Sequence, residues 1–144
     1  MLDKRLVASL VLGFGLVATA AYAQTSSPAQ QSAQAPSPIT RTILQTTNYP
    51  GDQYQTVTAY VVIAPGGLAA RHTHPGVEIG YVLEGEGDLM VAGQPVRHIK
   101  AGDSFMNGAE VPHAFQNTNG DKPTKILSTY VVDKNKPLAS AAPG

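Results

Sequence analysis

Three of the four histidines in the sequence fall into two short segments whose spacing suits metal binding. His72 and His74 are separated by one residue, so on a β-strand their side chains share a face and lie about 6.6 Å apart along the chain. Two imidazoles in this arrangement can converge on a single ion with metal–nitrogen bonds of about 2.1 Å. The segment therefore predicts part of a metal site.

Glu78 and His113 are the candidates for the remaining ligands. Glu78 follows His74 at an even spacing, which keeps it on the same strand face unless Pro75-Gly76 bends the chain between them. Its carboxylate would offset the charge of a cation held otherwise by neutral imidazole. His113 lies in a later apolar run and would come from a different strand. Such a nitrogen–oxygen set suits Fe, Mn, Ni, Co, Cu or Zn and leaves positions open for water or substrate.

The alternative is that each histidine is a solvated or hydrogen-bonded side chain with no ligand role.

The amino-acid composition excludes several classes of site and partner. The 144-residue chain has no cysteine, which excludes disulfides, thiolate nucleophiles and thiolate ligands. Its net charge is zero and its basic residues are scattered, so nothing favours nucleic acid as a partner.

The first 23 residues have the features of a secretory signal peptide. A basic end at Lys4-Arg5 precedes an apolar run, and the small residues of Ala21-Tyr22-Ala23 close it. We expect cleavage after Ala23, no stable membrane insertion afterwards, and a periplasmic or secreted mature protein. The alternative is an uncleaved membrane anchor, for which 18 residues is the lower limit.

Strands predominate in the rest of the chain. Residues 24–38 lack apolar periodicity and predict a flexible linker, residues 39–136 predict the folded domain, and residues 137–144 predict a loose C-terminal tail. The 14 glycines and 11 prolines favour a turn-rich fold. Short β-branched and aromatic runs separated by turns indicate an all-β sandwich or barrel. These runs cover residues 56–63, 77–83, 88–91, 95–99, 113–117 and 125–132.

The region around the histidine pair resembles the first conserved motif of the cupin superfamily. Gly66, His72, His74, Glu78 and Gly85 stand at every fixed position of that motif.

The second cupin motif is matched by Gly102, His113 and Asn117 at the required spacings. Two positions depart from it, since Gly108 stands where proline is usual and Glu110 where glycine is usual. We therefore expect a turn of different shape before His113, with Glu110 near the mouth of the site.

This resemblance implies a cupin jelly-roll β-barrel in a single domain. It also implies one divalent transition metal held by His72, His74, Glu78 and His113, with Glu78 as ligand or catalytic base. Family members include dioxygenases, lyases, isomerases and non-catalytic sensors. We favour a metal-dependent enzyme acting on a small organic molecule; the alternative is a non-catalytic binding or sensing cupin. A homodimer is expected, because exposed strand edges need covering.

Other residues are assigned lesser roles. His98 matches no motif position and predicts a surface or packed histidine. Tyr81 should point away from Glu78 by strand alternation. Asn107 either lines a cavity or caps a turn, and Gly80 is expected to leave room for a ligand. An apolar wall of the site is expected from Val82, Phe105 and Phe115.

Overall fold

The computed structural model describes residues 37–143, which form ten β-strands and no helix. Between residues 37 and 143 there is no helix with the length and hydropathy that a membrane crossing requires. The predicted signal peptide and nearly all of the predicted linker lie outside the described residues. The strands are β1 (Ile39–Thr47), β2 (Tyr54–Ile63), β3 (Leu68–Thr73), β4 (Gly76–Glu84), β5 (Glu86–Val91), β6 (Arg97–Lys100), β7 (Ser104–Asn107), β8 (His113–Asn117), β9 (Thr124–Asp133) and β10 (Ser140–Ala141).

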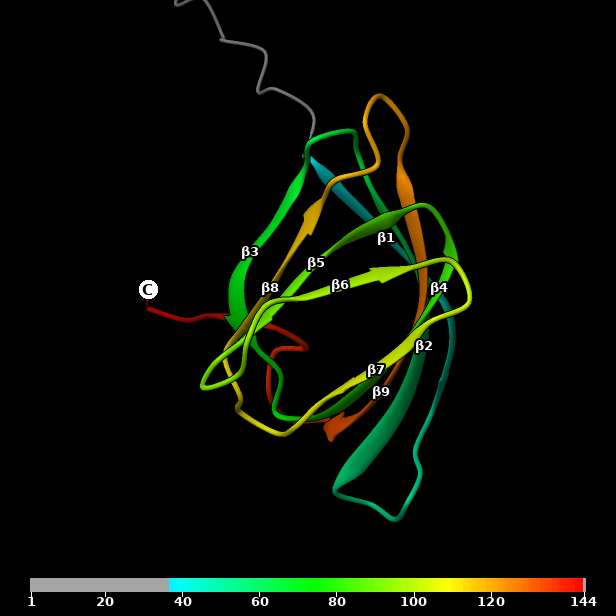
Figure 1. Ribbon diagram of the computed structural model, residues 1–144. Helices are drawn as coiled ribbons and strands as arrows, with labels where there is room; N and C mark the ends of the chain where they lie inside the picture. The colour runs from blue at the N-terminus through cyan, green and yellow to red at the C-terminus, as the bar shows by residue number, and fades with distance from the viewer. Residues whose placement is uncertain (1–36, 144) are drawn as a thin grey trace, which may run out of the picture. The chain divides into compact units, whose positions relative to one another are not determined.

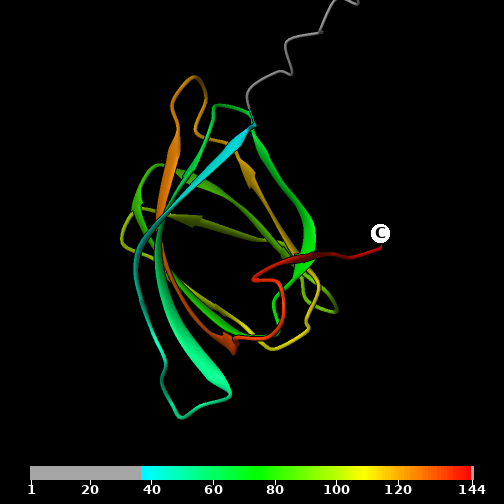
Figure 2. The same ribbon diagram turned by 180° about the vertical axis from the view of Figure 1, so that it is seen from behind.

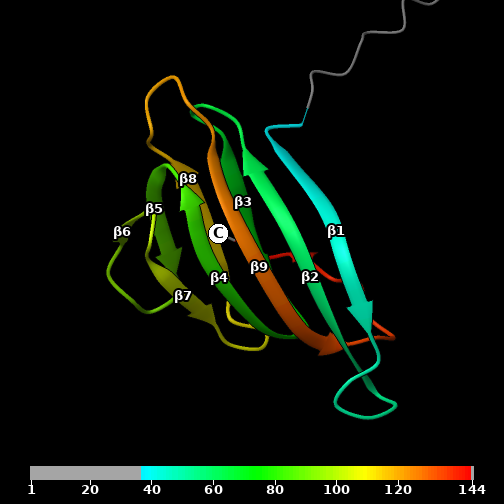
Figure 3. The same cartoon turned by 90° about the vertical axis from the view of Figure 1, so that its right-hand side faces the viewer.

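The strands form two five-stranded antiparallel sheets that face each other (Figure 1). The first sheet has the order β1-β2-β9-β4-β7, which Figure 3 shows with its strands side by side. The second has the order β10-β3-β8-β5-β6. The all-β jelly-roll prediction is confirmed.

Alternation of side chains along the strands builds the core between the sheets. In β9 every second residue from Thr124 to Val132 is buried, because successive side chains point to opposite faces of a sheet. Val57, Ala59, Val61 and Ile63 of β2 are buried in the same way. Burying each large aliphatic side chain stabilises the fold by about 1.5–3 kcal/mol. The inner face of β9 also carries Ser128 and Tyr130 into this apolar layer.

The sequence patterns identified some strands better than others. The run predicted at residues 113–117 coincides with β8, and the run at 125–132 lies inside β9. No run was predicted for β1 or β7. β1 is an edge strand whose side chains are almost all exposed, so it lacks a buried alternation. β7 has only four residues, too few for a recognisable period.

The C-terminal segment is not the loose tail expected for residues 137–144. It contains β10, which pairs with β3 through Ser140–Thr73 and Ala141–His72. The Arg71 side chain also donates a hydrogen bond to the carbonyl of Pro143. Figure 2 shows this segment lying beside β3. The expectation failed because backbone pairing and carbonyl contacts leave no trace in side-chain composition.

Candidate metal centre

The predicted ligands come from both sheets. His72 on β3 and His113 on β8 are directly paired across neighbouring strands of the second sheet. His74 follows the end of β3, in the connection to β4. Glu78 lies on β4 of the first sheet and faces them across the interior. The fold therefore brings together residues that the sequence places on three separate segments.

The three histidines form a compact group that could hold one metal ion. One potential ligand atom from each of His72, His74 and His113 lies within 4.8 Å of the other two. Their ring centroids are 4.3–5.1 Å apart. His74 and His113 are 1% and 3% exposed, while His72 is half-buried. This group is the one that the spacing of the histidines predicts.

Each of the three rings is held by its Nδ1 atom. A carbonyl oxygen can only accept a hydrogen bond, so each Nδ1 must carry the proton. In a neutral imidazole, Nε2 then has a lone pair available for a metal. The three Nδ1 atoms of His72, His74 and His113 lie 2.7, 2.6 and 2.9 Å from the carbonyl oxygens of Ala70, Leu138 and Val111, respectively.

The remaining nitrogens face the carboxylate of Glu78. Its Oε2 atom lies 3.5 Å from Nε2 of His74 and 3.2 Å from Nε2 of His113. Both Nε2 atoms are buried and have no hydrogen-bond partner among the described residues. Two lone pairs and a carboxylate therefore converge in a buried space without a donor between them. The lone pairs and the carboxylate repel one another when nothing lies between them. A divalent metal ion placed there would be coordinated by all three groups, so these residues fit a divalent metal.

A hydrogen bond holds the Glu78 carboxylate in place. Asn107, its partner in the pairing of β4 with β7, donates a hydrogen bond to Glu78 Oε2 at 2.9 Å. Burial disfavours the charged carboxylate, whereas the hydrogen bond donated by Asn107 favours it and lowers the pKa of Glu78. Of the two roles predicted for Asn107, lining a cavity and capping a turn, the structure shows the first. Asn107 also orients the Glu78 carboxylate.

A cavity of about 210 Å³ adjoins the centre. His72, Glu78 and His113 line it, whereas His74 does not. Apolar side chains of both sheets complete most of the wall, and the predicted contribution of two phenylalanines is confirmed. The lining includes Ile39, Val61, Ile63, Leu89, Phe105, Phe115 and Ile126.

Three polar lining residues were not predicted from the sequence: Arg41, Ser128 and Tyr130. Tyr130 is 1% exposed, pairs with Glu78 across β4 and β9, and its ring lies 4.8 Å from that of His74. Ser128 and Tyr130 could have been predicted from the alternation of side chains along β9, because it places both on the same face as Ile126. No sequence pattern marked Arg41 as a lining residue, since it lies on an edge strand without alternating buried residues.

Three further predictions have different outcomes. Tyr81 is 47% exposed on the outer face of its sheet and points away from the site, as predicted. Gly80 does not leave room for a ligand. A Cβ atom there would lie 2.1 Å from the ring of Phe105, so the glycine makes room for that ring instead. Val82 is fully buried in the core and does not line the cavity.

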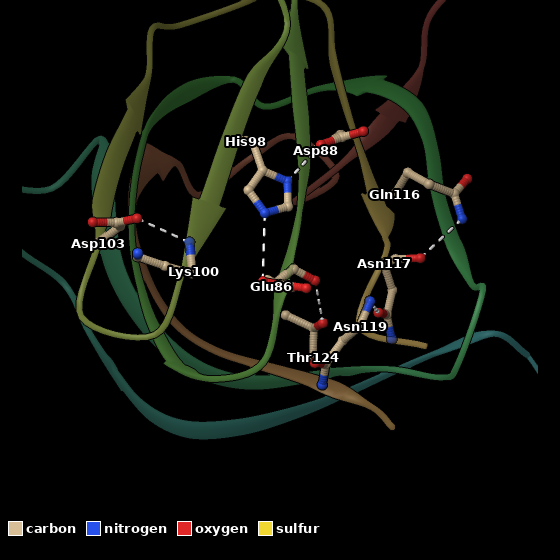
Figure 4. A network of polar contacts seen from close by, with 9 residues as sticks. All are labelled: Glu86, Asp88, His98, Lys100, Asp103, Gln116, Asn117, Asn119 and Thr124. Carbon is tan, nitrogen blue, oxygen red and sulfur yellow. Dashed lines mark hydrogen bonds and ion pairs between the residues drawn. The ribbon is translucent and has the colours of Figure 1, made fainter. Parts of the chain in front are cut away.

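His98 lies outside the centre. It projects from β6 toward β5, where its Nδ1 atom lies 2.9 Å from Asp88 and its Nε2 atom 3.5 Å from Glu86 (Figure 4). The three side chains are 38–53% exposed. This placement agrees with the surface role predicted for His98 and makes it a control for the metal centre.

The turn before His113 contains Glu110, which stands where the second cupin motif usually has glycine. This residue has a φ of 57°, a left-handed conformation that glycine adopts more readily. Its backbone N–H donates to the carbonyl of His74, so the turn still supports the centre. The Glu110 side chain does not line the cavity and instead lies 3.7 Å from Lys136. Its expected place near the mouth of the site stays a prediction.

Acidification should destabilise the metal-free protein. Burial lowers the pKa of His72 below the ordinary value of 6.5, against the opposing hydrogen bond to Ala70. Between the lowered pKa and 6.5 the unfolded chain binds more protons than the folded chain, so stability rises with pH. We expect melting temperature to fall as pH drops below about 6.5. Affinity for a divalent ion should fall in the same direction.

The measurement is thermal melting between pH 8 and pH 5 in a His98→Gln background. The pKa of His98 is raised by its hydrogen bond to Asp88, so His98 would add stability at low pH and oppose the trend. A melting temperature that stays constant or rises on acidification in this background would contradict the prediction.

Removing residues 137–144 should weaken metal binding. The deletion removes the Leu138 carbonyl that fixes the His74 ring, and β10 with it. Loss of such a supporting contact lowers metal affinity about 10–100-fold. Competition with a chromophoric chelator, at a temperature where both proteins are folded, measures the change. Removing only residues 143–144 keeps Leu138 and β10, and equal losses in the two deletions would contradict the assignment.

Residues 59–130, half of the 144-residue chain, match the cupin domain family. The chain therefore belongs to the cupin family, as its motifs predict.

Three relatives show the range of proteins that it resembles. Germin-like protein subfamily 2 member 2 of Arabidopsis thaliana is 40% identical over 77 residues, which are 50% of this chain and 35% of that protein. Dimethylsulfoniopropionate lyase DddQ of Ruegeria pomeroyi is 39% identical over 59 residues, 40% of this chain and 29% of the lyase. HTH-type transcriptional regulator PuuR of Escherichia coli is 47% identical over 49 residues, 34% of this chain and 26% of the regulator.

The crystal structure of the lyase DddQ superposes with a TM-score of 0.61 at 24% identity, covering 72% of this chain and 51% of that one. This likeness shows the fold. The chain spans about a third or less of the length of these curated relatives.

Proposed function

We propose that the chain is a metal-dependent cupin enzyme that acts on a small organic molecule by lyase- or dioxygenase-type chemistry. The observation that carries this proposal is the meeting of the buried Nε2 atoms of His74 and His113 with the Glu78 carboxylate beside a cavity. The cavity is small, at about 210 Å³. The resemblance to a dimethylsulfoniopropionate lyase supports the choice of an enzyme.

His72, His74 and His113 would hold the metal, with Glu78 as a fourth ligand or as the base. A bound divalent ion would polarise a substrate oxygen atom. The Glu78 carboxylate would accept a proton from the substrate if it acts as the base, and Asn107 keeps this carboxylate in place.

Two other groups of the cavity support this role. Burial, with the charge of Glu78, raises the pKa of Tyr130, so its hydroxyl remains protonated and can donate a hydrogen bond. Phe105 of β7 and Phe115 of β8 add apolar surface to the cavity from both sheets, which disfavours water there.

The second candidate is a non-catalytic binding module. The similarity to a transcriptional regulator, 47% identical over 49 residues, favours it. The same centre would then hold a metal and a ligand without converting the ligand.

The two functions differ in turnover. Protein loaded separately with Mn, Fe, Co, Ni, Cu or Zn would be incubated with dimethylsulfoniopropionate, with gas chromatography to detect a volatile product. Oxygen uptake would be followed with a panel of small organic acids. Glu78→Gln should lower any turnover about 10²–10⁴-fold, while His98→Gln should not. Ligand binding without turnover for every metal would favour the binding module.

We further propose that the mature protein starts at Gln24, is exported, and forms a homodimer. The outer face of the first sheet supports pairing, because Ile79, Tyr81, Leu83 and Met106 are 41–66% exposed there. Mass spectrometry of the native protein tests the first point, and light scattering at micromolar concentration tests the dimer. An intact N-terminus or a monomeric mass would contradict them.

A further inference from the structure

We infer that the cavity selects a short organic acid, with Arg41 as the residue that recognises its carboxylate. This inference rests on the proposed function, since the other end of the acid would reach the metal centre. It goes beyond that function by naming the class of substrate and a residue that determines specificity.

The distribution of charge in the cavity is the first observation. Arg41 and Glu78 are the charged residues that line it. The Glu78 carboxylate is engaged by Asn107 and faces the histidines. Arg41 is solvent-exposed and also lines the cavity, so its side chain links the cavity wall to the surface. A ligand entering there meets a positive charge first and the metal centre further in.

Arg41 has no ion-pair partner within residues 37–143. Its guanidinium carbon lies 5.8 Å from the centroid of the Tyr130 ring, a cation–π distance that restrains the side chain. A guanidinium held this way presents a planar set of N–H donors that matches the two oxygens of a carboxylate. Arg41 is therefore held ready to bind an anion.

Tyr130 connects this group to the metal centre. It has the Arg41 guanidinium against its ring and the His74 ring 4.8 Å away. Val61 and Ile126 line the cavity on the same sheet. A ligand with a carboxylate at one end, a short aliphatic chain, and a metal-binding oxygen function at the other end matches this order of groups.

The experiment compares two series of hydroxamic acids with the Zn²⁺-loaded full chain by isothermal titration calorimetry. Both series bind metal through the same hydroxamate. One series ends in a carboxylate after two, three or four methylenes, and the other ends in a methyl group on a chain of equal length. Because charge-assisted hydrogen bonds are strong, we expect the carboxylate to improve affinity at least tenfold for one chain length or more.

Arg41→Gln should remove this preference and leave binding of the methyl-terminated probes within about twofold, whereas Arg97→Gln should keep it. Arg97 is an exposed arginine on β6 that does not line the cavity. Equal affinity for the two series in the wild type, or a preference that survives in Arg41→Gln, would overturn the inference while leaving the metal proposal standing. Binding of neither series would overturn both.

Discussion

Replacing His113 by alanine should abolish most of the thermal stabilisation that a divalent ion gives to the metal-stripped protein. The same result is expected for His74→Ala. A ligand that binds only the folded state stabilises it by about 2.7 kcal/mol at a hundredfold excess over its dissociation constant. Both histidines contribute a buried Nε2 atom with no other partner among the described residues, so each substitution removes a coordinating atom.

The measurement is thermal melting with each divalent ion added back to the metal-free protein. His98→Ala is the matched control, because His98 is an exposed histidine whose partners are Asp88 and Glu86 rather than the centre. It should keep the full response. Loss of the response in His98→Ala, with retention in His113→Ala, would show that the ion binds elsewhere and that the assignment of the centre is wrong.

Asn117→Ala should destabilise the protein by about 3 kcal/mol or more without removing a metal ligand. Asn117 is 2% exposed, and its Nδ2 atom lies within 3.0 Å of the carbonyl oxygens of Ile63, Ala64 and Lys122. Its Oδ1 atom accepts a hydrogen bond from the Asn119 backbone. Alanine would leave several of these groups unpaired in or near the core.

Urea unfolding of the metal-free protein measures this loss. The neighbouring Gln116→Ala is the control, since Gln116 also donates to backbone carbonyls but is less buried than Asn117. Figure 4 shows both side chains. It should cost about 1 kcal/mol. An equal cost for the two substitutions would contradict the view that Asn117 of the second motif joins β8 to the loops beside it.

The metal centre could be predicted in large part because its signals are local. His72 and His74 are two residues apart, and Glu78 follows within the same motif. The resemblance to cupins then added His113 and the barrel. The resemblance also singled out Asn117 and Glu110 as motif positions, but it did not predict what their side chains and backbone do in the fold. The hydrogen bonds of Asn117 and the positive φ of Glu110 depend on how distant loops meet.

The rest of the cavity could not be predicted because its residues are distant in sequence and lack a distinctive pattern. Arg41 lies on an exposed edge strand, and Tyr130 becomes informative only when the pairing of β9 with β4 is known. The Leu138 carbonyl that fixes His74 belongs to the backbone, so no side-chain type marks it. Gly80 was misjudged because only the structure shows the Phe105 ring above it.

The claim that three histidines hold one ion is tested most directly by a crystal structure of the metal-loaded protein with anomalous diffraction at the absorption edge of the ion. We expect a single strong peak about 2.1 Å from the Nε2 atoms of His72, His74 and His113. A peak beside His98 and Asp88 instead, or no peak in crystals grown with excess metal, would contradict it.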